Sequence, residues 1–210
     1  MAPVRSRRRT GVIALPALLE PLLLLLMASS TINLGCPVPP AWHIEGVPFA
    51  AHTSDWCGPA ALAAVLGYWG DAVEVEEIAE AIHLPDYRGS LNLDLLIVAR
   101  QRGFEAWAGE STTDELRRAL ARGQPVICMV RRRNPLAARN HFVVLRGYDV
   151  EKRLWLLDSG EGAEERIADD DFDREWRDAG RWMLVVEGRS AGPLRGETPR
   201  QQEDPRGQGQ

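Results

Sequence analysis

The chain has 210 residues, of which 45% are apolar and 26% are charged, and its formal net charge is −5 at neutral pH. This length and balance are typical of one soluble globular domain with additional terminal segments. The charge is unevenly distributed, because residues 1–35 carry four arginines and one glutamate, whereas the remainder has a net charge of −8. An acidic domain lacks the basic face that phosphate binding needs, so the composition argues against nucleic acid as a partner.

The first 35 residues have the layout of an export signal. Four arginines precede an apolar stretch over residues 11–28, which is the order of a basic n-region and an apolar h-region. Two prolines and Glu20 interrupt the stretch, whereas a membrane-spanning helix needs about 18 apolar residues with few charges. We therefore expect residues 1–35 to be a cleaved signal peptide, and the protein to act on the periplasmic or cell-surface side.

The expected signal ends in Asn33-Leu34-Gly35-Cys36. A small residue followed by cysteine after an apolar segment resembles the lipobox of bacterial lipoproteins, although Asn33 and Leu34 replace the leucine and small residue usual there. The resemblance implies that Cys36 is a lipid-attachment residue and that the protein is a membrane-anchored lipoprotein. The alternative is an unpaired thiol in an exported segment, which an oxidising compartment disfavours.

Composition also sets the borders of the domain. Residues 36–41 contain a proline-rich run that is typical of a stiff, extended spacer. Residues 189–210 contain a single large aliphatic side chain, Leu194, and cannot bury enough apolar surface to offset the entropy lost on ordering, so we expect a disordered tail. The folded domain is therefore predicted to span residues 42–188.

The first half of this domain is predicted to be helical. Residues 57–69 give the strongest signal, with Pro59 suited to a first turn, alanines in the interior and apolar residues all round, as in a buried helix. Further helices are predicted over 75–83, from a Ser90 cap to Gly103, and from a Thr112-x-x-Glu115 capping box to the residue before Gly123.

The second half changes to short apolar runs that are typical of buried strands. These runs cover residues 126–130, 142–145, 154–157 and 182–186. Helices followed by antiparallel strands predict an α+β fold in which the two halves face each other.

Cys57 is a candidate nucleophile because it lies where the chain enters the buried helix. Backbone N–H groups at a helix start favour an anion, so we expect a lowered thiol pKa. The Cys57 N–H is also placed to help form an oxyanion hole. The alternative is that Cys57 is a small apolar residue at the helix start, since free cysteine is among the most buried residue types.

His141 and Asp158 are candidate partners of Cys57. His141 opens the predicted strand 142–145, and Asp158 ends the strand 154–157, one hairpin away. Adjacent antiparallel strands can bring such residues side by side. Asp158 would then orient the His141 imidazole as a general base for Cys57, in a nucleophile–base–orienter arrangement.

Three blocks of this sequence resemble a known family. His52–Leu62, His141–Asp149 and Leu157-Asp158 are similar to the motifs of the bacteriocin-processing type of cysteine peptidase, which often precedes a transporter and cuts double-glycine leaders. The resemblance covers about residues 47–187. It implies a papain-like fold, hydrolysis of peptide bonds in a peptide or protein substrate, and neither a metal nor an organic cofactor.

One position departs from the family pattern. The family usually has a glutamine a few residues before the cysteine, whose amide helps to hold the oxyanion, and His52 occupies that place here. An imidazole N–H can donate the same hydrogen bond, so His52 is a candidate oxyanion donor with a different pH dependence.

The sequence also suggests structural roles for Cys128 and for residues 131–139. Cys128 lies inside an apolar run and is expected in the core. Residues 131–139 form a basic segment before His141, which we expect to be a solvated loop unless it attracts an acidic peptide or a phospholipid surface.

The sequence therefore predicts an exported cysteine peptidase with Cys57, His141 and Asp158 as catalytic residues and His52 assisting. Two alternatives stay open: a transferase that uses the same Cys57 thioester, and a weak or inactive papain-like lipoprotein that binds peptides.

Overall fold

The computed structural model describes residues 37–50, 54–133, 137–160 and 164–189. The expected export signal, the expected lipid-attachment residue Cys36, the candidate oxyanion donor His52 and the expected tail beyond Arg189 lie outside these residues.

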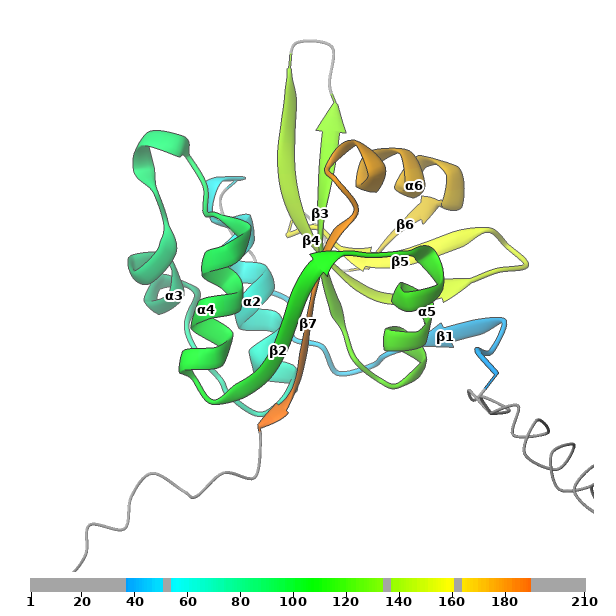
Figure 1. The fold of residues 1–210 in the computed structure, drawn as a ribbon, viewed down its shortest axis with the longest axis horizontal. Helices are drawn as coiled ribbons and strands as arrows, with labels where there is room; N and C mark the ends of the chain where they lie inside the picture. The colour runs from blue at the N-terminus through cyan, green and yellow to red at the C-terminus, as the bar shows by residue number, and fades with distance from the viewer. Residues whose placement is uncertain (1–36, 51–53, 134–136, 161–163, 190–210) are drawn as a thin grey trace, which may run out of the picture. The chain divides into compact units, whose positions relative to one another are not determined.

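The strands form one antiparallel sheet in the order β2-β7-β3-β4-β5-β6, and β1 pairs with β4 outside this path. Figure 1 shows the long β3–β4 pair at the centre of the molecule. The strands are β1 (Ala41–His43), β2 (Phe104–Glu110), β3 (Val126–Arg133), β4 (Ala138–Asp149), β5 (Leu154–Asp158), β6 (Glu165–Ala168) and β7 (Trp182–Arg189).

The helices lie on both sides of these strands. Helices α2, α3 and α4 gather on one side, and α5 and α6 lie on the other (Figure 1). Both α2 and α5 pack against β4, whereas α4 packs against β2 and α6 against β3. Their bounds are α2 (Cys57–Tyr68), α3 (Val75–Ile82), α4 (Asn92–Gln101), α5 (Thr113–Ala121) and α6 (Asp169–Asp178), with short 3₁₀ turns at Ser54–Trp56 and Pro85–Tyr87.

Helix α2 is the buried centre of the helical half, as its sequence predicts. Every residue from Cys57 to Leu66 is buried. The capping box at α5 is also confirmed, because Thr112 Oγ1 accepts the Glu115 N–H at 3.3 Å and Glu115 Oε2 accepts the Thr112 N–H at 3.0 Å. Both elements can be recognised from short stretches of sequence.

The predicted Ser90 cap is wrong. Helix α4 begins at Asn92, whose Oδ1 accepts the Leu93 N–H at 3.0 Å. The Ser90 hydroxyl is buried, and it finds no hydrogen-bond partner within the described part of the chain.

Four elements were not predicted: β1, β2, β6 and α6. Helix α6 begins with three aspartates and buries only Phe172 and Trp176, which is too sparse a pattern for a periodicity argument. Strands β1 and β6 are short and half or fully exposed, so their existence depends on the neighbouring strands rather than on their own composition.

The N-terminal border of the fold lies earlier than residue 42. The Tyr148 hydroxyl donates to the Pro39 carbonyl at 2.9 Å, and the Val150 N–H donates to the Pro40 carbonyl at 2.9 Å. The second half of the expected spacer is therefore bound to the sheet.

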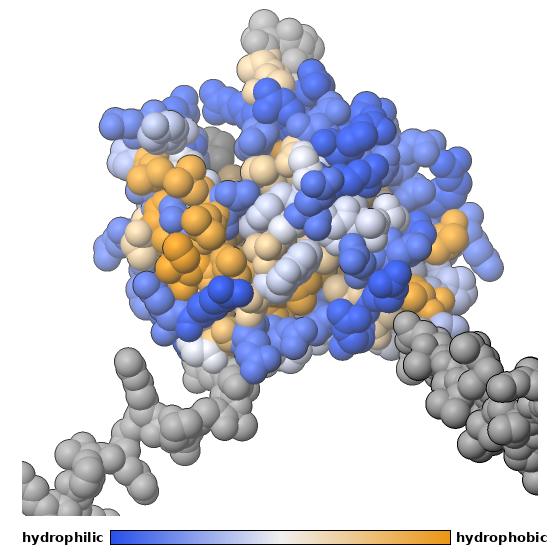
Figure 2. Space-filling model, viewed as in Figure 1, coloured by the Kyte–Doolittle hydropathy of each residue, from blue (hydrophilic) through white to orange (hydrophobic). Residues whose placement is uncertain are grey.

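Within the described ranges, no helix has the length and apolar character needed to cross a membrane. Figure 2 shows an apolar area over α4, where Leu93 and Ile97 are exposed and Leu91 precedes the helix.

Candidate active site

Cys57 is the first residue of α2, and only 7% of its surface is exposed. The backbone groups of Phe142, Gly58 and Cys57 itself favour negative charge on its sulfur, and each lowers the pKa of the thiol. The first N–H groups of a helix have no partner inside the helix, so they are free to stabilise negative charge at this point. The sulfur therefore lies where the start of α2 meets β4.

The pKa of the Cys57 thiol is nevertheless raised above its ordinary value. Removal of the thiol from water is the largest cause, and the three backbone groups only partly offset it; the Asp55 carboxylate adds a smaller increase. The expectation of a lowered pKa, drawn from the helix start alone, is therefore wrong for the free protein. The thiol needs a base to lose its proton at neutral pH.

Gly58 allows the start of α2 to approach β4 closely. A Cβ atom at this position would lie 3.3 Å from Phe142 Cδ2 and 3.3 Å from Ser90 Cβ. These distances are tighter than ordinary van der Waals contact, so a larger residue would push the nucleophile away from the strand that carries His141.

His141 lies on β4 directly before Phe142, and it pairs with Val130 of β3. Its Nε2 lies 2.8 Å from the carbonyl oxygen of Ser159. A carbonyl can only accept, so Nε2 carries a proton, and whenever the ring is neutral the lone pair is on Nδ1. This tautomer is the one that can accept a proton at Nδ1.

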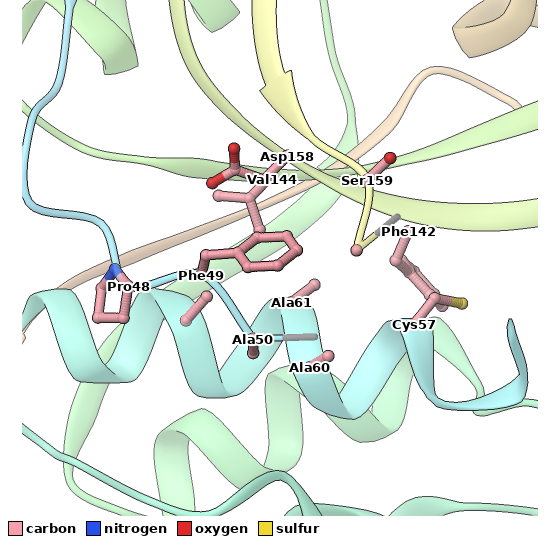
Figure 3. A pocket seen from close by; sticks show the side chains of 12 residues that line it. Pro48, Phe49, Ala50, Cys57, Ala60, Ala61, Phe142, Val144, Asp158 and Ser159 are labelled. Atoms are coloured by element: carbon pink, nitrogen blue, oxygen red, sulfur yellow. The ribbon is translucent and has the colours of Figure 1, made fainter. Parts of the chain in front are cut away.

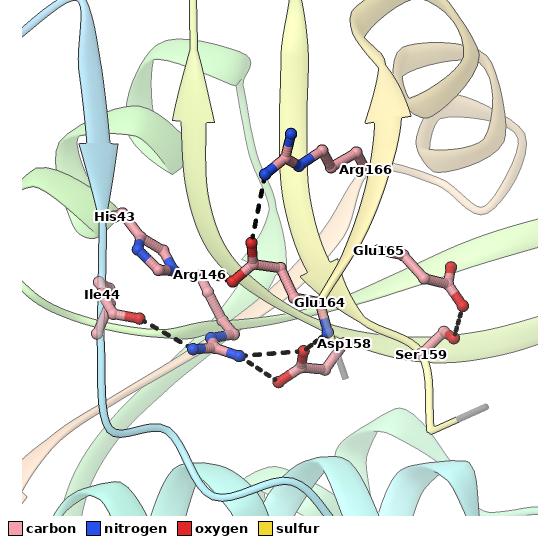
Figure 4. Close-up of polar contacts among 8 residues, drawn as sticks. All are labelled: His43, Ile44, Arg146, Asp158, Ser159, Glu164, Glu165 and Arg166. Carbon is pink, nitrogen blue, oxygen red and sulfur yellow. Dashed lines mark hydrogen bonds and ion pairs between the residues drawn. The ribbon is translucent and has the colours of Figure 1, made fainter. Parts of the chain in front are cut away.

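No hydrogen bond joins Asp158 to His141, so the contact that the predicted orienting role requires is not formed in this structure. Figure 4 shows its carboxylate facing Arg146, whose Nη1 lies 3.3 Å from both Oδ1 and Oδ2. The Glu164 N–H also donates to Asp158 Oδ1 at 2.7 Å. Ser159, the next residue, bonds to His141 instead.

The register of β4 and β5 explains this arrangement. Leu145 pairs with Leu157 and Gly147 with Leu156, so Arg146 is an extra residue in a β-bulge. Such a bulge redirects its side chain, and here it brings the guanidinium to Asp158. Asp158 pairs with Val144, three residues along the strand from His141.

A narrow, mostly apolar pocket runs from Cys57 along α2. Figure 3 shows the Phe49 ring lying between α2 and the end of β5, with Asp158 and Ser159 on the far wall. Phe142 lies beside Cys57, at the Cys57 end of the pocket. The nucleophile thus lies at one end of a narrow pocket that is lined mainly by apolar side chains.

The basic segment 131–139 is mostly not a solvated loop. Strand β3 continues to Arg133 and β4 begins at Ala138, with residues 134–136 outside the described ranges. The three arginines of β3 have partners on the domain itself: Arg131 Nη1 bonds to Asn140 at 3.0 Å, Arg132 contacts Glu165 and Glu175, and Arg133 contacts Asp178 at 2.9 Å.

Cys128 is fully buried in the core, as predicted. No cluster of three or more His, Cys, Asp or Glu side chains suited to a metal ion occurs in the described part of the chain.

Three residues of this site were missed in the sequence: Arg146, Ser159 and Glu165. Arg146 gave one signal, since it is a charged residue inside the apolar run that ends at Tyr148. A buried charge in a strand predicts an ionic partner. Ser159 contacts His141 through its backbone carbonyl, and Glu165 bonds to the Ser159 hydroxyl. Nothing in the sequence around these two residues indicates such contacts.

Comparison with known proteins agrees with the resemblance stated above. Residues 43–183 match the Peptidase_C39 like family. No curated protein matches the sequence.

Several solved structures have a similar fold. The peptidase domain of Streptococcus ComA, a bifunctional ABC transporter involved in quorum sensing, is 18% identical with a TM-score of 0.56, and the match covers 69% of this chain and 100% of that one. A putative C39-like peptidase from Bacillus anthracis is 16% identical with a TM-score of 0.60, covering 71% and 98%. A double glycine motif protease of an AMS/PCAT transporter, in complex with the leader peptide, is 24% identical with a TM-score of 0.54, covering 70% and 98%. At such identities the likeness concerns the fold, and it confirms the papain-like α+β architecture.

Proposed function

Because the chain belongs to the Peptidase_C39 like family of cysteine peptidases, we propose that it hydrolyses peptide bonds through Cys57, with His141 as general base. One observation carries this proposal: Cys57 and Phe142, the residue that follows His141, line the same pocket, and the Phe142 backbone favours the ionised form of the Cys57 thiol. Nucleophile and base thus come from adjoining segments, α2 and β4, of one site.

The proposed reaction begins when the Nδ1 of His141 takes the proton from the Cys57 thiol as the sulfur attacks the peptide carbonyl. The Cys57 N–H donates to the developing oxyanion, and His52 is the second proposed donor. His141 then returns the proton to the leaving amine. Water, deprotonated by His141, attacks the thioester, releases the second product as an acid and restores the thiol.

Two observations at this site are also compatible with a second candidate function. A Cys57 thiol with a raised pKa, and an Asp158 carboxylate engaged by Arg146, are also compatible with a papain-like module that binds peptides and reacts slowly. The transferase alternative shares the first half of the reaction and differs only in passing the acyl group to an amine.

The location is proposed from the sequence. We propose that residues 1–35 direct export and that a lipid on Cys36 holds the domain at a membrane. Peptides are the proposed substrates. A double-glycine preference belongs to the transporter-linked protease described above and is left to experiment.

The test is the rate of iodoacetamide labelling of Cys57 at pH 7, read for each cysteine peptide by mass spectrometry, in the protein and in its His141→Ala variant. Cys128 is fully buried and serves as the internal control. Labelling that falls at least tenfold in the variant supports the Cys57–His141 pair, and a peptide library with and without added amines then separates hydrolase from transferase. Equal, slow labelling in both proteins would leave the binding module as the function.

A further inference from the structure

Ser159 makes two hydrogen bonds that point in different directions. Its carbonyl oxygen accepts a hydrogen bond from His141 Nε2 at 2.8 Å. Its hydroxyl donates to Glu165 Oε1, as Figure 4 shows. Only 4% of its surface is exposed. One buried residue therefore joins the candidate base to a carboxylate on another strand.

Glu165 is itself held in place. It is the first residue of β6 and pairs with Leu157 of β5. Its Oε2 lies 3.5 Å from Arg132 Nη2, and Arg132 Nε lies 3.4 Å from Glu175 Oε2. Arg132 belongs to β3, but it and Glu165 are each more than a third exposed, so this ion pair contributes little to the position of Glu165, which its pairing with β5 fixes.

Gly160, the residue after Ser159, gives the backbone unusual freedom at this point. Gly160 has a φ of +80°, a conformation that glycine adopts without the strain of other residues. The carbonyl of Ser159 belongs to the peptide unit that joins it to Gly160, and glycine permits that unit to rotate. Rotation would turn the carbonyl away from His141. The hydroxyl bond to Glu165 holds the Ser159 side chain, and thereby the Cα atom from which this peptide unit extends.

We propose that Glu165 is a positioning residue for His141: it holds the Ser159 hydroxyl, keeps the Ser159 carbonyl facing Nε2, and so keeps the lone pair of the imidazole on Nδ1. The proposal rests on the proposed function for its effect on Cys57. Its effect on the His141 tautomer is independent of whether Cys57 reacts.

The first readout is therefore the tautomer, measured from the ¹⁵N shifts of the His141 ring in the full chain and assigned with His141→Gln. The protein and Glu165→Gln, whose amide oxygen still accepts from Ser159, are expected to keep the proton on Nε2. Glu165→Ala and Ser159→Ala, which retains the backbone carbonyl, are expected to give a mixture of the two tautomers. Arg132→Gln removes the ion pair but leaves the Ser159–Glu165 bond, so it is the matched control and should resemble the unchanged protein.

The second readout is Cys57 labelling at pH 7. Loss of one hydrogen bond predicts a decrease of roughly three- to tenfold in Glu165→Ala. Because Glu165 acts through Ser159, the same change made in the Ser159→Ala background should have less than about a twofold further effect. An unchanged tautomer in Glu165→Ala, or an effect just as large in the Ser159→Ala background, overturns the proposal. If iodoacetamide does not label Cys57 of the unchanged protein, the peptidase proposal fails. The His141 tautomer alone then tests whether Glu165 is a positioning residue.

Discussion

Arg146 Nη1 lies 3.3 Å from each carboxylate oxygen of Asp158, across a bulge that interrupts the pairing of β4 with β5. The two side chains are only 11% and 6% exposed. The guanidinium also approaches the Ile44 carbonyl at 3.5 Å, and the Ile44 N–H donates to the Arg146 carbonyl at 2.8 Å. This ion pair therefore links β4, β5 and the segment after β1, next to the candidate active site.

Removal of Arg146 should destabilise the fold strongly. Arg146→Gln leaves the Asp158 carboxylate buried without its cation, and breaking a buried pair from one side costs about 3 kcal/mol or more. We expect a decrease of this size in the free energy of unfolding, measured with urea. In Arg146→Gln/Asp158→Asn the uncompensated charge is gone, so this double variant should recover much of the loss.

An exposed pair supplies the control for this cycle. Arg174 and Asp171 are 54% and 52% exposed, and Arg174→Gln should leave the free energy of unfolding nearly unchanged. An Arg146→Gln protein as stable as Arg174→Gln would show that the Asp158 carboxylate does not depend on this partner.

Gly147 follows the bulge and should not tolerate a side chain. A Cβ atom there would lie 2.5 Å from the Trp42 carbonyl oxygen and 3.2 Å from His43 Cα, both in the backbone of β1. Gly147→Ala must displace β1, and we expect a loss of about 2–3 kcal/mol in the free energy of unfolding. Hydrogen exchange of the β1 amides should accelerate as well.

Gly188 of β7 is the matched position. The nearest atom to a Cβ there is a Trp69 ring carbon at 3.8 Å, so Gly188→Ala should alter stability by less than about 1 kcal/mol. Similar losses of stability in Gly147→Ala and Gly188→Ala would show that displacement of β1 does not lower the free energy of unfolding.

What the sequence predicted correctly depends on short stretches of chain. The buried α2 follows from its continuous apolar composition, and the cap of α5 follows from two residues three positions apart. The position of Cys57 at the start of α2 is likewise a local property. These features need no knowledge of which strands pair.

The incorrect predictions concern features that depend on tertiary structure, such as the register of paired strands. The sequence brings Asp158 near His141 if β4 and β5 pair without interruption, but the bulge at Arg146 gives the carboxylate another partner. The Cys57 thiol pKa has a similar origin. Burial by β4 outweighs the effect of the helix start, and this burial depends on tertiary packing.

The raised pKa of Cys57 predicts the pH profile of the His141→Ala variant. Without a base the thiol ionises only on its own pKa, which burial raises, so labelling should be slow at pH 7 and keep increasing above pH ~8.5, the usual thiol value. Iodoacetamide rates between pH 6 and pH 10 would measure this. A rate that levels off below pH ~8.5 in the variant would show that the backbone groups of Phe142, Gly58 and Cys57 outweigh burial.

Cys128 should make the protein less stable in alkali. Full burial raises its thiol pKa well above the ordinary value, so the folded protein keeps the proton that the unfolded chain loses near pH ~8.5. Stability from this group is present below that pH and is lost as pH rises, by about 1.4 kcal/mol between pH 7 and pH 9.5. Cys128→Ala is less stable at both pH values because it leaves a cavity. Between pH 7 and pH 9.5, however, the free energy of unfolding of Cys128→Ala should decrease less than that of the unchanged protein, by about 1.4 kcal/mol, as measured by urea unfolding. Equal decreases in the two proteins would mean that the Cys128 thiol ionises as readily in the fold as in the unfolded chain.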